Sequence, residues 1–154
     1  MRMNIHIENR QKAVKLDLRR IRRVVCKLKK VLCCSDQEIS LLFVDNKQIR
    51  ELNRQYLNRD HPTNVISFSL REGDCGHVNP HLLGDIVISV ERALQDAASG
   101  DLPLDDEIDF LLIHGMLHLL GYNHEGIDEN EAIKMRGKED AVFFLLKGYQ
   151  LERI

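Results

Sequence analysis

The sequence lacks a long hydrophobic run, a secretory leader and paired cysteines. No apolar stretch approaches the roughly 20 residues that a membrane-spanning helix needs, and no short apolar segment follows the first residues as it does in a signal peptide. The four cysteines form no Cys-x-x-Cys pair, and two of them, Cys33 and Cys34, are adjacent, which suits a disulfide poorly. We therefore expect a cytoplasmic protein with reduced thiols and no membrane contact.

The chain also has no internal repeat, no low-complexity tract and no linker rich in Pro, Gly or Ser, so it offers no domain boundary. Its 154 residues suit one domain, and a domain of this size buries roughly 68–70% of its unfolded surface. We predict a single domain over residues 1–154.

The net charge of −2 conceals a strong asymmetry. Residues 1–77 hold 16 Lys and Arg against 9 Asp and Glu, whereas the remaining residues hold 6 against 15. Ten of the basic residues lie between Arg10 and Lys30, where Asp17 is the only acid. This basic segment is either an ordinary solvated helix face or a face that docks on RNA or the ribosome.

Hydrophobic periodicity predicts an α+β domain, with one small sheet of about four strands packed with about five helices. We expect strands near residues 4–9, 38–44, 65–70 and 82–90, the last of them central because it is almost continuously apolar. We expect helices near residues 16–32, 46–56, 90–98, 105–120 and 128–147. In the second helix, Tyr56 has the spacing of a core residue.

Three histidines at metal-ligand spacing are the most specific feature of the sequence. His114 and His118 are four residues apart and share one face of a helix. Gly121 then permits the chain to turn and bring His124 over the same face. Three imidazoles with an open fourth position describe a catalytic zinc site, so we predict one zinc ion, or another divalent metal, on this buried helix.

The same spacing occurs in metzincin proteases, which need a Glu after the first histidine as general base. This chain has Gly115 there, which counts against a metallopeptidase. Zinc brings the pKa of a bound water to about 7 without such a residue, so hydrolysis stays feasible. The candidate catalytic residues are Asp85, a carboxylate in an apolar strand, and Arg59, a cation that could neutralise a phosphate.

Several separate motifs resemble the YbeY family of metal-dependent endoribonucleases. They are LNRQY at 52–56, DHPTNVISF at 60–68, LGDI at 83–86 and the histidine motif itself. The resemblance implies a single domain with a small mixed sheet and a metal on His114, His118 and His124. It also implies action on single-stranded RNA during late ribosomal RNA processing, at the 3′ end of the small-subunit species, and in ribosome quality control. The expected partners are then ribosomal RNA and the small ribosomal subunit or its proteins.

Two positions depart from the family pattern. Leu57 stands where the family usually has an arginine that is considered important for activity, and Arg59 is the nearest arginine. Asn123 stands where an aspartate commonly precedes the third histidine. Three functions therefore remain open: an endoribonuclease, a metallopeptidase, and a non-catalytic ribosome-associated factor whose metal stabilises the fold.

Overall fold

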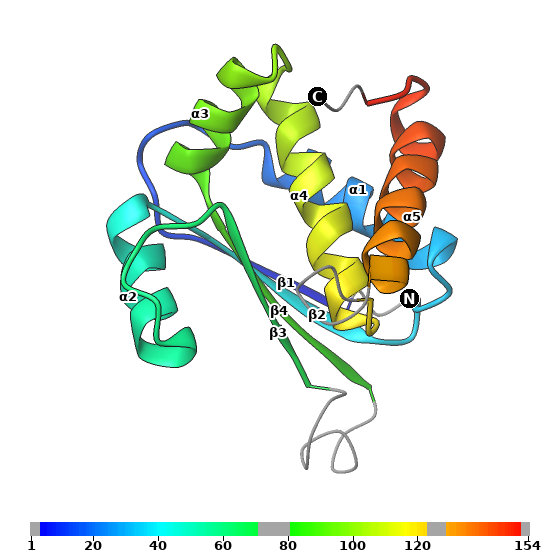
Figure 1. Ribbon diagram of the computed structural model, residues 1–154, viewed down its shortest axis with the longest axis horizontal. Coiled ribbons are helices and arrows are strands. Elements are labelled where there is room, and N and C mark those ends of the chain that lie inside the picture. The colour runs from blue at the N-terminus through cyan, green and yellow to red at the C-terminus, as the bar shows by residue number, and fades with distance from the viewer. Residues whose placement is uncertain (1–3, 71–80, 123–128, 152–154) are drawn as a thin grey trace.

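The computed structural model describes residues 4–70, 81–122 and 129–151. Within them, four strands and five helices follow one another in the order β1, α1, β2, α2, β3, β4, α3, α4, α5 (Figure 1). The α+β architecture with a four-stranded mixed sheet is therefore confirmed. The strands are β1 Ile5–Asn9, β2 Glu38–Val44, β3 Val65–Ser69 and β4 Leu82–Ser89; the helices are α1 Leu18–Val31, α2 Asn46–Leu57, α3 Val90–Ser99, α4 Leu104–Leu119 and α5 Glu129–Lys147.

The sheet has the strand order β1-β2-β4-β3. Strands β1, β2 and β4 are parallel, and β3 pairs with β4 in the antiparallel direction at one edge. The central place of β4 agrees with its nearly continuous apolar sequence, because both of its faces are covered. Gly84 interrupts that strand for a steric reason: a Cβ there would lie 2.2 Å from the carbonyl oxygen of Phe68 on β3.

The helices divide between the two faces of the sheet. Helices α1, α4 and α5 pack on one side and α2 lies on the other (Figure 1). Helix α4 is buried almost all round because the sheet lies beneath it and α5 lies against it, which explains its uniformly apolar sequence. Within the described residues, no helix has the length and hydrophobicity required to cross a membrane.

Local signals fix where the helices begin. Asp17 caps α1 by accepting a hydrogen bond from the backbone of Arg20, and Asp45 forms a reciprocal capping box with Gln48 at α2. The expected core position of Tyr56 is wrong, because its side chain is 61% exposed at the end of α2. Helical spacing predicted a shared face with Ile49, but the last turn of α2 extends past the core.

Candidate metal centre and cleft

His114 and His118 lie near the carboxyl end of α4 with their rings close together. Their Nε2 atoms are 3.2 Å apart and their ring centroids are 4.6 Å apart. Both side chains are only partly buried, because they face a cavity between α4 and strand β3. The i, i+4 spacing thus places the two imidazole rings on the same face of α4, with one nitrogen of each ring close to the other.

The separation of these nitrogens suits two ligands of one metal ion. Nitrogens about 2.0–2.1 Å from a tetrahedral zinc are roughly 3.3–3.4 Å apart. The third predicted ligand, His124, lies outside the described residues. Among those that are described, no three His, Cys, Asp or Glu side chains gather closely enough to hold a metal. The three-histidine site therefore stays a prediction, two members of which are positioned for it.

A buried carboxylate on α5 fixes the orientation of one of these rings. The Oε2 atom of Glu139 lies 2.9 Å from Nδ1 of His114, and the glutamate is only 4% exposed. An ionised carboxylate can only accept, so this contact favours a proton on Nδ1, and a neutral ring in that tautomer has the Nε2 lone pair available to a ligand. Nothing in the histidine motif points to Glu139. The available signal was its place on the buried face of α5, four residues after Met135 and three before Val142.

A side chain at position 115, directly after the first histidine, would point away from the cavity. A Cβ on Gly115 would lie 3.0 Å from two side-chain carbons of Ile86, because α4 packs tightly on β4 at this point. A glutamate here would meet the sheet rather than the face that carries His114. The missing protease base is thus a consequence of close helix–sheet packing, and the metallopeptidase reading loses its geometric support.

Two serines of β3 tie the metal helix to the edge of the sheet. The Ser67 hydroxyl donates a hydrogen bond to the carbonyl oxygen of Gly115, and the Ser69 hydroxyl donates to that of Leu119, each at 3.3 Å. These bonds join the strand that forms one wall of the cavity to the helix that forms the other.

The cavity beside the histidines is a polar cleft of about 470 Å³. Its lining includes Leu57 and Arg59, so the arginine lies in the same cleft as the two histidines. Asn58 produces this placement: it takes a left-handed conformation with φ 58° that ends α2 and turns the chain. The buried Asn53 side chain then holds the turn by donating to the carbonyl oxygen of His61 at 2.8 Å.

Asp85 is not brought together with the histidines. It pairs across the sheet with Phe68, and both side chains line a different cavity of about 490 Å³, which Tyr56 of α2 also lines on the other face. Burial raises the pKa of Asp85, although a hydrogen bond with Ser40 opposes the shift. Its suggested role as a base at the metal finds no support in this placement, and its catalytic role stays a prediction without a geometric argument.

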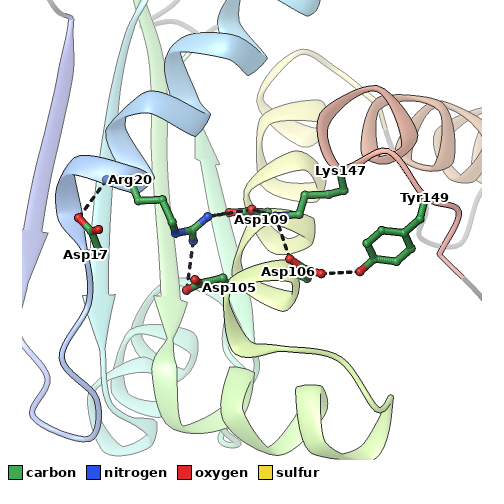
Figure 2. A network of polar contacts seen from close by, with 7 residues as sticks. All are labelled: Asp17, Arg20, Asp105, Asp106, Asp109, Lys147 and Tyr149. Atoms are coloured by element: carbon green, nitrogen blue, oxygen red, sulfur yellow. Dashed lines mark hydrogen bonds and ion pairs between the residues drawn. The ribbon is translucent and has the colours of Figure 1, made fainter.

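A buried charge network holds the helices around the candidate site (Figure 2). Asp109 of α4 is fully buried; Arg20 of α1 donates to both of its oxygens at 3.1 and 3.0 Å, and Lys147 of α5 donates at 2.9 Å. Lys147 also pairs with Asp106, which accepts a hydrogen bond from Tyr149.

The charges in this network shift the ionisation of its members. Burial opposes the ionisation of Asp106, but hydrogen bonds from Lys147 and Tyr149 outweigh it and hold the pKa of this carboxyl below its ordinary value. Burial, together with the hydrogen bond to Asp106, raises the pKa of Tyr149 to about 12. Asp106 and Lys147, whose pKa is raised by these acids, thus stay charged at neutral pH, and their ion pair fixes the end of α5, the helix that carries Glu139.

The fold and the polar cleft, which is lined by two converging imidazoles of α4 and by an arginine from the turn after α2, define a candidate hydrolase. Comparison with known proteins narrows this class. The family model described as Endoribonuclease YbeY matches residues 6–147. The chain belongs to the YbeY family.

Curated relatives agree over nearly the whole chain. The protein named Endoribonuclease YbeY from Syntrophus aciditrophicus is 57% identical over 99% of this chain and 95% of its own length. The protein of the same name from Geobacter sulfurreducens is 42% identical over 94% of this chain and 97% of its own length. The solution structure of TM1509 from Thermotoga maritima superposes with a TM-score of 0.66 at 27% identity, covering 94% of this chain and 89% of that one.

Proposed function

We propose that this chain is a metal-dependent endoribonuclease that cuts single-stranded RNA. The observation that carries the proposal is the pair of Nε2 atoms 3.2 Å apart, facing the cleft that Arg59 also lines, in a chain of the YbeY family. Arginine suits a phosphodiester because its planar guanidinium pairs with phosphate oxygens.

Each residue has a role that its surroundings support. His114 and His118, joined by His124, are the proposed metal ligands, and zinc is the proposed ion. Such an ion, when bound, supplies a Lewis acid and a water of lowered pKa. Glu139 accepts a hydrogen bond from Nδ1 of His114 and so favours the tautomer and orientation of that ring that a ligand needs.

Arg59 binds the phosphate and offsets the negative charge that grows on it during cleavage. It takes the place of the arginine that the family usually has at position 57, because the turn at Asn58 brings it into the same cleft that Leu57 lines. Asp85 receives no part in this mechanism, since it faces the other cavity.

The cellular role follows the family resemblance and is part of the proposal. The expected substrate is precursor ribosomal RNA at the 3′ end of the small-subunit species, with a further role in ribosome quality control. The expected location is the cytoplasm, and the expected partner is the small ribosomal subunit or its proteins.

The test is cleavage of labelled single-stranded RNA, matched duplex RNA and casein by the purified full chain, stripped of metal and then reloaded with zinc. We expect the reloaded protein to cut only the single strand. His118→Ala should lose both zinc and cleavage, whereas His81→Ala, an exposed histidine outside the cleft, should keep both. Full zinc content and full cleavage in His118→Ala would overturn the proposal.

A further inference from the structure

Helix α1 carries a row of four cations along its exposed side. Arg19, Arg23, Lys27 and Lys30 follow one another at steps of four, four and three, and all four side chains are exposed. At 3.6 residues per turn they fall within an arc of about 80°. We call these four residues the basic stripe.

The structure separates the stripe from the other cations of the same segment. Arg20 is bound to the buried Asp109, Arg22 donates to the backbone carbonyl of Ile5, and Lys29 is buried. Those three side chains serve the fold. The four of the stripe make no ion pair or side-chain hydrogen bond with any residue in the described ranges.

Some exposed cations elsewhere pair with an acid. Arg50 pairs with Asp60, and Arg54 with Glu51, on the surface of α2. In a chain of net charge −2, four neighbouring cations without an acid among the described residues concentrate positive potential on one helix. A polyanionic partner would complement this potential, whereas an ordinary solvated face would have no such partner.

We propose that the basic stripe binds the phosphate backbone of the RNA substrate at a distance from the cleft. This inference rests on the proposed function. Helix α1 contacts β1, one edge of the sheet, whereas the cleft borders β3, the other edge. The stripe extends about 16 Å along the helix, so its four cations can contact several successive phosphates. It therefore contributes affinity for long RNA and no chemistry.

Salt dependence measures this contribution. Neutralising four phosphate contacts on a single strand changes the slope of log affinity against log salt by about 3. For the variant Arg19→Gln/Arg23→Gln/Lys27→Gln/Lys30→Gln, the slope of log affinity against log salt should therefore be shallower by about 3 than for wild type. A four-fold rise in salt then weakens RNA binding by wild type roughly 50-fold more than binding by the variant.

The matched control removes the same charge elsewhere: Arg10→Gln/Lys47→Gln/Arg54→Gln/Lys134→Gln. Three of these cations already pair with an acid, so the control should keep most of the wild-type slope. The measurement is fluorescence anisotropy with a long single-stranded RNA, and the same proteins are assayed for cleavage of a short RNA that only fills the cleft. The stripe variant should cut the short RNA at the wild-type rate.

This design distinguishes failure of the inference about the stripe from failure of the proposed function. Equal salt slopes for the stripe variant and the control would show that the stripe is a solvated face and would overturn the inference. Absence of cleavage by zinc-loaded wild type would overturn the proposed function, while the binding slopes would still decide whether the stripe holds RNA.

Discussion

Replacing Glu139 tests the candidate metal centre through a residue that touches no metal. In Glu139→Gln the side chain keeps its shape but loses its charge, and the hydrogen bond of 2.9 Å with Nδ1 of His114 becomes a bond to a neutral acceptor. The ring is then held less firmly in the ligand tautomer. We expect zinc to bind 10- to 100-fold more weakly, which corresponds to about 1.4–2.7 kcal/mol.

The control is Glu131→Gln, the same chemical change on the same helix. Glu131 is half exposed and its nearest cation, Lys134, lies 4.0 Å away, so the substitution should leave zinc affinity unchanged. Affinity is measured by competition with a chromophoric chelator, and urea denaturation of the metal-free proteins shows whether the fold is kept. The nitrogen chemical shifts of the His114 ring report its tautomer independently of cleavage.

Two outcomes would refute this reasoning. One is equal zinc affinity in the Glu139 and Glu131 variants with both folded. The other is a His114 ring that stays protonated at Nε2 in the wild-type protein, because that tautomer cannot present Nε2 to a metal.

Three further predictions concern charge. Asp109→Ala removes the buried acid that Arg20 and Lys147 share, both of them partly buried, and we expect it to lower the free energy of unfolding by about 3 kcal/mol in urea denaturation. Burial, with Asp96 nearby, raises the pKa of Glu107 from 4.5 to about 7, so the folded protein binds this proton more tightly than the unfolded chain and stability falls as pH rises through that interval. Glu107→Gln should flatten that part of the stability profile by at most roughly 3 kcal/mol, and an unchanged profile in urea titrations across pH would contradict the assignment. Arg59→Gln should lower kcat/KM for RNA roughly 100-fold in a steady-state cleavage assay, and adding Leu57→Arg should recover part of the loss; no recovery would mean that the two positions do not reach the same phosphate.

The secondary structure could be predicted from the sequence because the local periodicity of apolar residues determines it. Each of three local patterns specifies an element without knowledge of the rest of the chain. They are the alternation of polar and apolar residues before Arg10, the apolar residues at helical spacing in α1, and the histidines four residues apart in α4. The central place of β4 followed from a strand that is apolar on both faces, whereas the mixed direction of the sheet was implied by the family resemblance alone.

The parts of the site that depend on tertiary packing were not readable. The face on which Asp85 lies was hidden, because an almost continuously apolar strand has no alternation that separates its two sides. Glu139 is 25 residues from His114, and only the packing of α5 on α4 brings them together. The reason for Gly115 likewise needed the contact with Ile86.

The hydrogen bonds from Ser67 and Ser69 to the carbonyl oxygens of α4 have a consequence for substrate choice. They join both sides of the cleft into one unit, so its width cannot grow unless both bonds break and β3 peels from the helix. A cleft of fixed width selects molecules by their thickness. Under the proposed function this rigidity would favour an unpaired strand over a double helix, which the cleavage assay with matched duplex RNA tests.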